Sequence, residues 1–324
     1  MQAVFLDYKT VDSGDLDLSP ISNLLPELIV YENTKAEEIS DRIKNAEIII
    51  INKVELDSSL LSQAHNAKLV CLVATGTNNV DLESAKNLGI AVCNIKDYCT
   101  DSVVQHVFLS ILALQHSLLS YQKSLDQGAW QNSDQFSLLN HPIAELRAKK
   151  LGIIGFGVLG GGVAKMAQHF GMEVLIAESL AKKGISQTNN GLERMRFKDV
   201  IQQSDFISLH CPLTEHTEKL FNQSVFQDMK NTAFLINTAR GALIEDQDLI
   251  EAIQNKDIAG AAIDVFDEEP PPLDHPLIRE PFHNLIITPH IAWAAVEARQ
   301  RALECIAENI DAFLRDKPIN VVNA

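Results

Sequence analysis

Residues 151–160 read Leu-Gly-Ile-Ile-Gly-Phe-Gly-Val-Leu-Gly, a short apolar run that leads directly into the pattern G-x-G-x-x-G. A helical pattern continues from there to His169. The glycine pattern alone is weak evidence, because glycines cluster in many loops. Its position between a strand and a helix is what a dinucleotide-binding loop requires. This stretch therefore predicts a strand, a glycine loop and a helix at the start of a nucleotide-binding domain.

Each glycine of the loop has an expected task. We expect Gly155 to allow the tight turn, Gly157 to let the backbone approach a pyrophosphate, and Gly160 to let helix and strand pack closely. The N–H groups of Val158 and Leu159 would then face the phosphates from the helix N-terminus. The alternative is a purely structural strand–turn–helix unit.

The next expected strand ends at Glu178, eighteen residues after Gly160. A carboxylate there can accept hydrogen bonds from both adenosine ribose hydroxyls, and it repels a 2′-phosphate. The sequence therefore favours NAD as cofactor. Lys182 and Lys183 lie nearby and leave NADP open.

Short apolar runs alternate with helical patterns over almost the whole chain of 324 residues. Strands with helices between them imply a parallel sheet covered on both faces, and the length suggests two domains of roughly 150 residues. We therefore expect an α/β fold with two doubly wound domains, the second large enough for a full dinucleotide. The expected strands are residues 4–6, 28–30, 48–51, 69–74 and 90–93 in the first series, and residues 151–155, 173–177, 205–209, 233–237, 259–264 and 285–288 in the second.

Two long helices are also expected. Residues 101–120 are apolar nearly all round, which predicts one long, mostly buried helix capped by Thr100 or Asp101. Residues 293–314 carry apolar side chains at three-to-four spacing, which predicts an amphipathic closing helix.

Charge and composition exclude several classes of protein. The net charge is −16, and no Lys/Arg-rich run offsets it, so we expect no binding to nucleic acid or to anionic lipid. No apolar run approaches the ~18–20 residues that span a bilayer, and the N-terminal MQAVFLDYKT does not resemble a secretory signal. We expect a cytoplasmic protein with no metal site, because no tight Cys/His cluster occurs. Reduced, mostly buried thiols are expected at the five cysteines, Cys71, Cys93, Cys99, Cys211 and Cys305.

Polar residues end three consecutive strands of the second series. Arg240 follows the strand 233–237, Asp264 ends the next strand and precedes an acidic turn, and His290 follows the last strand. Each feature alone is ordinary: a solvated turn, an acidic surface loop and a cap. Because the carboxyl ends of parallel strands form the ligand crevice of such sheets, all three can converge there.

An arginine, a carboxylate and a histidine beside NAD suit reversible hydride transfer to the C2 carbonyl of a 2-oxo acid. Arg240 would hold the substrate carboxylate and carbonyl oxygen through its planar guanidinium. His290 would donate a proton to the developing alkoxide and take it back in the reverse direction. One carboxylate among Asp267, Glu268 and Glu269 would bond the other ring nitrogen, and the spacing alone does not select one of them.

These residues carry a family resemblance. Over nearly its whole length the chain resembles the D-isomer-specific 2-hydroxyacid dehydrogenase family, and within it the glycerate dehydrogenases (hydroxypyruvate reductases). The segments concerned are VATGTNNVDLESAKNLGIAVCN, YCTDSVVQHVFLSILAL, LGIIGFGVLG, SDFISLHCPLTEHT, LINTARGALI, GAAIDVFDEEPPP, NLIITPHIAWA and EARQR. Departures are modest: ELRAKK lacks the usual glycine before lysine, Val104-Gln105 replaces Ala-Glu, and Glu178 replaces the commoner aspartate.

The resemblance implies roles for particular residues. It makes Arg240, Glu269 and His290 the catalytic trio and assigns Asp264 to the nicotinamide carboxamide. Further cofactor contacts are implied for Cys211, Pro212, Thr217, Thr238 and Ala239. Backbone N–H groups for the substrate carboxylate are implied for Ala74, Thr75 and Gly76.

The resemblance also implies an organisation. A flavodoxin-like substrate-binding domain would comprise residues 1–100 and 290–324, and an inserted Rossmann NAD-binding domain residues 101–289, with hinges near residues 98–101 and 288–291. A homodimer built largely on the NAD-binding domain is implied. The expected substrate pair is hydroxypyruvate and D-glycerate; D-lactate, 2-ketogluconate, phosphoglycerate and formate activities are alternatives. A non-catalytic NAD-dependent scaffold of the same fold is the rival from another class.

Overall fold

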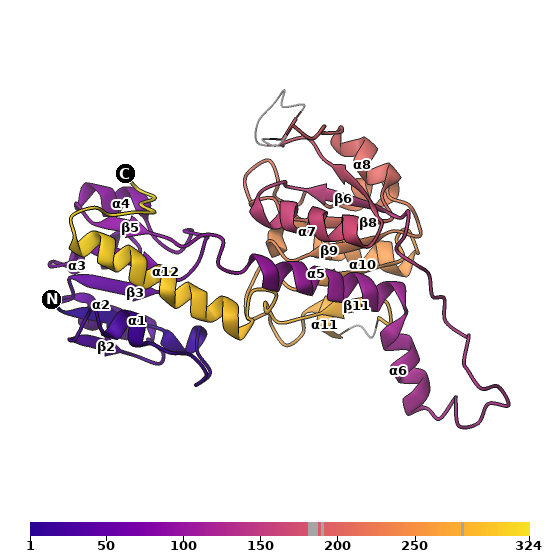
Figure 1. Ribbon diagram of the computed structural model, residues 1–324, viewed down its shortest axis with the longest axis horizontal. Helices are drawn as coiled ribbons and strands as arrows, with labels where there is room; N and C mark the ends of the chain where they lie inside the picture. The colour runs from indigo at the N-terminus through magenta and orange to yellow at the C-terminus, as the bar shows by residue number, and fades with distance from the viewer. Residues whose placement is uncertain (181–186, 189–190, 280–281) are drawn as a thin grey trace. The chain divides into compact units, whose positions relative to one another are not determined.

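The computed structural model describes residues 1–180, 187–188, 191–279 and 282–324 (Figure 1). The chain divides into two compact units. The outer unit comprises Met1–Cys99 and Trp293–Ala324, and the central unit comprises Thr100–Ala292. The boundary at which the chain returns to the outer unit was expected between residues 289 and 290. In the structure it lies three residues later, between residues 292 and 293, so that His290 belongs to the central unit.

The outer unit contains one parallel sheet with the strand order β2-β1-β3-β4-β5. This is the flavodoxin-like order, in which the chain changes direction across the sheet between β1 and β3. Because helices cover both faces, the strands are apolar throughout rather than alternating, and β3 consists of four buried isoleucines. The strands are β1 Ala3–Phe5, β2 Leu28–Val30, β3 Ile48–Ile51, β4 Leu69–Leu72 and β5 Ala91–Cys93.

Helices of the outer unit form two layers. On one face, α2 (Ala36–Ile43), α3 (Ser58–Gln63) and α4 (Leu82–Asn87) bury their apolar side chains with those of the sheet. On the other, α1 (Ser19–Ser22) packs on α12 (Val296–Leu314), which contacts β4. The closing helix, α12, was expected to begin at residue 293 and begins three residues later, at Val296. Its N-cap, Ala295, has ψ 143°, which is outside the helical region.

The central unit contains a second parallel sheet, with the order β11-β10-β9-β8-β6-β7. Met195 adds an isolated parallel bridge to Ala177, at the end of β7. When this bridge is counted as a strand, the order is that of a Rossmann domain, 3-2-1-4-5-6, with β11 as a seventh strand. The strands are β6 Lys150–Ile154, β7 Glu173–Ile176, β8 Phe206–Leu209, β9 Phe234–Asn237, β10 Gly260–Ile263 and β11 Leu285–Ile287.

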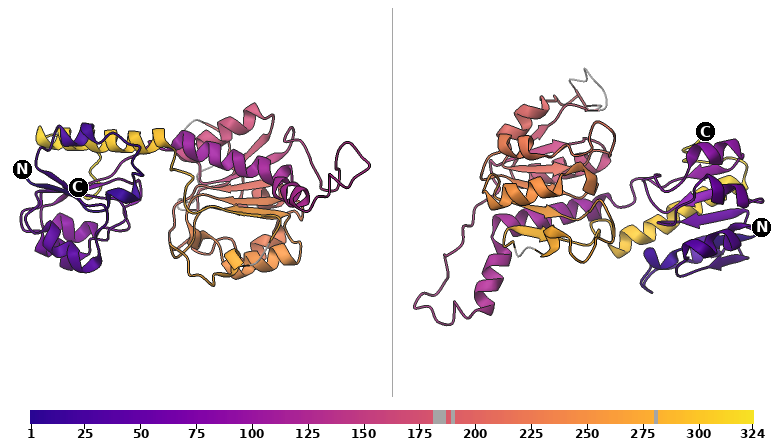
Figure 2. Two further views of the ribbon diagram at one scale, coloured as in Figure 1. Left: turned by 90° about the horizontal axis from the view of Figure 1, so that it is seen from below. Right: turned by 180° about the vertical axis from the view of Figure 1, so that it is seen from behind.

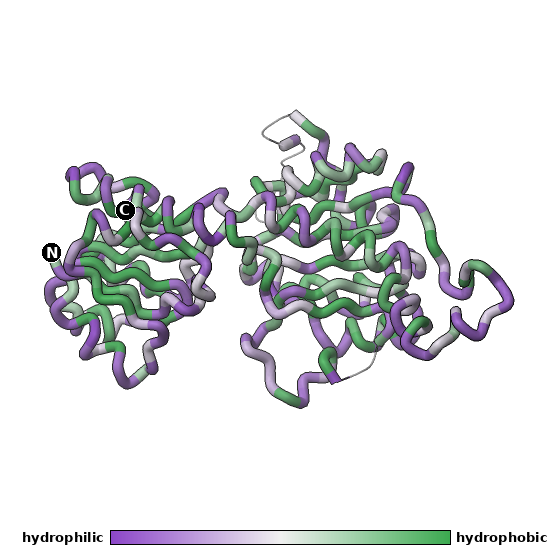
Figure 3. The backbone as a smooth tube through the Cα atoms, turned by 60° about the horizontal axis from the view of Figure 1, so that its bottom comes forward, coloured by the Kyte–Doolittle hydropathy of each residue, from purple (hydrophilic) through white to green (hydrophobic). Residues whose placement is uncertain are grey.

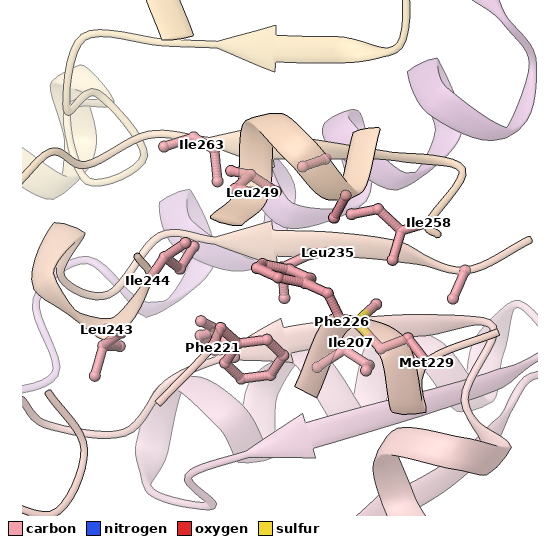
Figure 4. Close-up of a cluster of buried hydrophobic side chains, with 14 of the residues drawn as sticks. Ile207, Phe221, Phe226, Met229, Leu235, Leu243, Ile244, Leu249, Ile258 and Ile263 are labelled. Carbon is pink, nitrogen blue, oxygen red and sulfur yellow. The ribbon is translucent and has the colours of Figure 1, made fainter. Parts of the chain in front are cut away.

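Apolar side chains fill the space between this sheet and its helices. On one face, α8 (Phe197–Gln203), α9 (Gln223–Asp228) and α10 (Asp246–Gln254) contribute to a core in which Phe221 and Phe226 lie among strand residues such as Leu235 (Figure 4). On the other, α5 (Thr100–Gln115) packs on α7 (Val158–His169) and on β9 and β10. Figure 2 gives two further views of these layers, and Figure 3 shows the hydrophobic strands within each unit. Each of the eleven expected strands is present among the described residues.

The long helix expected at residues 101–120 is broken. α5 ends at Gln115, and α6 (Leu118–Asp126) follows after Ser117, whose φ of 49° is left-handed and ends the first helix. α6 and the loop after it project from the rest of the central unit (Figures 1 and 2). Within the described residues no single helix is long and apolar enough to cross a membrane; α5 and α6 pass by length and composition only together, bent by 59°.

Candidate active site

The glycine loop follows β6 at the carboxyl edge of the central sheet. Gly155 has φ 96°, and a Cβ atom there would lie 2.4 Å from the backbone nitrogen of Cys211. A Cβ atom on Gly160 would lie 2.2 Å from the carbonyl oxygen of Gly155. Both glycines are therefore required by the fold: one by a left-handed turn against the β8 loop, the other by close packing of α7 on that turn.

The third glycine is not required by the protein. A Cβ atom on Gly157 would meet nothing within 4 Å, so the space beside it is open to a ligand. Gly157 is the N-cap of α7 and supplies no side chain to the first N–H groups of the helix, which include those of Val158 and Leu159. Within the described residues the hydroxyl of Thr238, after β9, is buried without a hydrogen-bond partner. Open space, unused donors and an unsatisfied hydroxyl fit the pyrophosphate of a dinucleotide at this edge.

Glu178 stands at the end of β7, as expected, but its carboxylate has a protein partner. Oε1 accepts the backbone N–H of Phe197 at 2.9 Å, the first residue of α8. Arg194 lies close by and donates from Nη1 to the carbonyl of Ala177 at 2.8 Å, while its buried Nε has no partner in the described part of the chain. The sequence reasoning missed this arginine. Lys182 and Lys183 lie outside the described residues.

The loop after β8 packs against the glycine turn, since its residue Cys211 lies next to Gly155. Burial raises the pKa of the Cys211 thiol to about 11, so this cysteine is a neutral packing residue and not a nucleophile. The buried Thr217 hydroxyl donates to the carbonyl of Pro212 at 2.7 Å and so holds the loop from inside. Burial lowers the pKa of His210 to about 4, and its Nε2 lies 2.9 Å from Ser208 Oγ. All five cysteines are free and four are buried, as expected.

A turn after β9 presents Arg240. The buried Asn237 accepts the N–H of Ala239 at 3.0 Å and donates from Nδ2 to the carbonyl of Arg240 at 2.8 Å, so its side chain fixes the turn from both ends. Arg240 is exposed and donates from Nη1 to the carbonyl of Ala239 at 2.7 Å. Sequence reasoning missed the role of Asn237, although an asparagine two residues before a turn is a known signal.

The backbone brings this turn against the acidic loop. A Cβ atom on Gly241 would lie 2.0 Å from the carbonyl carbon of Phe266 and 2.2 Å from the nitrogen of Asp267. Only glycine permits this approach, which places Arg240 beside the segment that carries Glu269.

Glu269 and His290 are in direct contact. Glu269 Oε2 lies 2.6 Å from His290 Nδ1, and Oε1 accepts the N–H of Phe266 at 3.0 Å. Both side chains are partly exposed, at 31% and 29%. Of the three consecutive carboxylates, therefore, Glu269 is the one that meets the histidine. An imidazole held at Nδ1 by a carboxylate has its ring orientation and its tautomer fixed.

Asp264 contacts the loop that carries His290 and is 1% exposed. Its Oδ1 accepts from Thr288 Oγ1 at 2.5 Å and from the N–H of Ile291 at 2.9 Å, and its Oδ2 accepts from the N–H of Ala292 at 2.8 Å. The hydrogen bonds of this carboxylate thus fix the conformation of the loop that carries His290. This contact explains why residues 290–292 belong to the central unit.

The remaining predicted residues lie in the outer unit, after β4. The carbonyl of Ala74 accepts the N–H of Ile95 at 3.2 Å, and the carbonyl of Thr75 accepts from Asn94 Nδ2 at 2.8 Å. In the described part of the chain, the N–H groups of Ala74, Thr75 and Gly76 have no acceptor. Three unused donors on one loop can bind a carboxylate.

A doubly wound domain that carries a histidine–carboxylate pair at the same sheet edge as its glycine loop has the arrangement of a nicotinamide-dependent dehydrogenase. Comparison with known proteins defines the class further. Residues 108–292 match the family model for the NAD-binding domain of D-isomer specific 2-hydroxyacid dehydrogenases, and the chain belongs to this family. It is an NAD-dependent oxidoreductase that acts on the CH–OH group of 2-hydroxy acids.

Similar proteins match over the full length. The chain is 38% identical over 324 residues to a glycerate dehydrogenase of Methylorubrum extorquens, covering 100% of this chain and 99% of the relative. It is 36% identical over 326 residues to a hydroxypyruvate reductase of Blautia hydrogenotrophica, covering 100% of both. Among solved structures, an acyclic imino acid reductase in complex with NADPH and D-Arg has a TM-score of 0.86 at 27% identity, covering 99% of this chain and 100% of that one.

Proposed function

We propose that this dehydrogenase interconverts hydroxypyruvate and D-glycerate. The proposal of substrate is supported by the two full-length relatives, which are named for these two compounds. The proposal of mechanism is carried by one observation, the 2.6 Å contact between His290 Nδ1 and Glu269 Oε2 at the carboxyl edge of the central sheet.

The protein's part in the reaction is to move one proton. NADH, when bound, would supply the hydride for C2 of the 2-oxo acid and become oxidised NAD. His290 donates a proton from Nε2 to the carbonyl oxygen as negative charge develops there, and recovers it in the oxidation of the hydroxy acid. Glu269, bonded to Nδ1, orients the ring and stabilises the charge that the imidazolium carries.

Local positive features must bind an anionic substrate, because the chain carries a net charge of −16. We propose that Arg240 binds the substrate carboxylate and carbonyl oxygen through its guanidinium. In the outer unit, the N–H groups of Ala74, Thr75 and Gly76 are the further donors that we propose for an anionic group of the substrate. The two crossings of the chain between units, after Cys99 and after Ala292, would be the hinges.

The test is a spectrophotometric assay of NADH consumption with hydroxypyruvate, glyoxylate, pyruvate and 2-ketogluconate. We expect the highest kcat/KM with hydroxypyruvate, and clearly lower activity when NADPH replaces NADH. His290→Ala should lower kcat by roughly 10²–10⁴-fold while NADH still binds. NADH binding without turnover of any 2-oxo acid would favour the non-catalytic scaffold, and a higher kcat/KM with another acid would replace the proposed substrate.

The projecting arm supports a homodimer. α6 and the loop that follows it expose a series of large apolar side chains, and Phe136 is 91% exposed. Monomers seldom leave such a group of side chains in water, and a second copy of the chain would cover it. We expect sedimentation equilibrium to give a dimer, and Phe136→Asp with Leu139→Asp to give a monomer. The exposed residues are Leu118, Leu119, Trp130, Phe136, Leu139 and Ile143, and Leu109 of α5 is also exposed.

We also propose a cytoplasmic location. Five free cysteines, four of them buried, are typical of a reducing compartment. Fractionation of cells that express the protein at natural levels would test this.

A further inference from the structure

Two side chains of α5 contact the loop that carries His290. Ser102 and His106 lie one turn apart on this helix. Ser102 Oγ donates to the carbonyl of Ala292 at 2.7 Å, and His106 Nε2 lies 3.1 Å from Thr288 Oγ1. The helix therefore forms hydrogen bonds with both ends of the loop 288–292. His106 is only 11% exposed, and the catalytic roles proposed above do not use it.

The direction of the hydrogen bonds can be worked out from their partners. The Thr288 hydroxyl has one hydrogen, which goes to Asp264 Oδ1 at 2.5 Å, because that carboxylate can only accept. His106 must therefore donate from Nε2 to Thr288 Oγ1. A continuous chain results, from His106 through Thr288 to the buried Asp264, whose oxygens hold the N–H groups of Ile291 and Ala292.

The backbone held in this way is an uncommon one. His290 has φ 53°, a left-handed conformation that a residue with a Cβ atom seldom adopts. Its N–H donates to the carbonyl of Asp264 at 2.8 Å and to that of Thr288 at 3.0 Å. Such a conformation is strained and persists only where neighbouring contacts fix it. The conformation sets where the imidazole meets Glu269.

The helix itself is firmly anchored. A Cβ atom on Gly162 of α7 would lie 2.9 Å from Val104 Cγ2 and 3.2 Å from Thr100 Cγ2, so α5 and α7 pack at close range. α7 begins at the glycine loop. α5 thus contacts both the helix that follows the cofactor loop and the loop of the proposed proton donor.

We propose that His106 is a positioning residue, which fixes the loop of His290 by donating from Nε2 to Thr288 and thereby orienting the Thr288 hydroxyl toward Asp264. This inference rests on the proposed role of His290 in proton transfer. His106 does not touch the reacting atoms. Its effect is on where His290 lies.

The first test compares variants that differ in one hydrogen bond. His106→Leu removes the donor, whereas His106→Gln keeps an N–H at about the reach of Nε2. We expect His106→Leu to lower kcat by about 10–100-fold, as a displaced catalytic group does, with the dissociation constant of NADH unchanged. His106→Gln should recover most of the loss. Ser110→Ala is the matched control, because Ser110 is buried on the same helix and its hydroxyl donates, among the residues that the structure describes, to the carbonyl of His106 alone.

A double-mutant cycle tests whether His106 acts through Thr288. Thr288→Val should lower kcat to a similar extent, and the double variant with His106→Leu should lose little more, because both changes break the same chain. Losses that multiply, a His106→Gln variant no better than His106→Leu, or a His106→Leu variant as active as Ser110→Ala would each overturn the proposal.

Hydrogen exchange separates this inference from the proposed function. The amides of Ile291 and Ala292 should exchange faster in His106→Leu and Thr288→Val than in the wild type, His106→Gln and Ser110→Ala. Unchanged exchange would overturn the positioning role even if activity falls. If the wild type turns over no 2-oxo acid, the proposed function fails, and the exchange rates still decide whether His106 holds the loop.

Discussion

Replacing Glu269 by glutamine isolates the charge of one carboxylate. Glu269 Oε2 lies 2.6 Å from His290 Nδ1, and Oε1 accepts the N–H of Phe266 at 3.0 Å. Glutamine has the same shape, and its carbonyl oxygen can keep one of these contacts. What it removes is the negative charge beside the imidazole.

The magnitude follows from the kind of hydrogen bond that is lost. A hydrogen bond to a charged group contributes about 1.5–3 kcal/mol, against about 0.5–1.5 kcal/mol between neutral groups. Both side chains are about 30% exposed, so water screens part of the difference. We therefore expect Glu269→Gln to cost about 1–2 kcal/mol in stabilising the imidazolium, which is a factor of about 5–30.

The assay is kcat/KM for D-glycerate oxidation, in which His290 gains a positive charge as it takes the proton from the hydroxyl group. Glu269→Gln should lower this kcat/KM by the factor above, because a neutral amide no longer stabilises that charge. Glu268→Gln removes the same charge one residue away and should not lower it. An unchanged kcat/KM in Glu269→Gln, or an equal fall in Glu268→Gln, would refute the assignment.

Three further substitutions test other parts of the molecule. Arg240→Lys should lower kcat/KM for the 2-oxo acid by about 10–100-fold without changing NADH affinity, because an ammonium cannot make the bidentate contact; steady-state kinetics and NADH titration measure this. Glu178→Gln should reduce the preference for NADH over NADPH by about 5–30-fold, the value of about 1–2 kcal/mol of lost repulsion, measured as the ratio of kcat/KM values. Asp205 tests acid stability: partial burial raises its pKa, but the Lys150 N–H and the Lys230 ammonium outweigh this and lower it. Because the pKa of Asp205 is lower in the folded protein than in the unfolded chain, its ionised carboxylate stabilises the fold above the ordinary pKa of aspartate, and this stabilisation is lost as the pH falls through the lowered pKa. Asp205→Asn should therefore lower the free energy of unfolding by about 1–2 kcal/mol at neutral pH and leave it unchanged in strong acid, as measured by denaturant unfolding.

The strands could be predicted because each is a short, mainly apolar run bounded by helical patterns, as burial on both faces of a parallel sheet favours. Two backbone features could not. The break after Gln115 depends on a left-handed Ser117 within a sequence that is apolar on both sides, and hydrophobic spacing does not encode the sign of φ. Met195 pairs with Ala177 as a single bridge, and one residue has no alternation to detect.

In the candidate site, too, some residues could be predicted from the sequence and others could not. The glycine loop, Arg240 and His290 could be predicted because each stands at a strand end, where function concentrates in these sheets. The choice among Asp267, Glu268 and Glu269 could not be derived from spacing, because three consecutive residues on a turn point in different directions. The structure selects Glu269 by its contact with His290.

Asp264 shows how one buried carboxylate can link the loop to the cofactor. A carboxylate offers about four acceptor positions, and Thr288, Ile291 and Ala292 occupy three. Among the described residues no fourth donor bonds to it, and the remaining position would suffice for the carboxamide N–H that the family resemblance assigns to this residue. The same side chain would then bind the nicotinamide and set the position of His290, so that the hydride donor and the proton donor share a single support. A substitution at Asp264 would disturb both at once, whereas His106 and Thr288 reach only the loop, which is why they are the better places to separate the two effects.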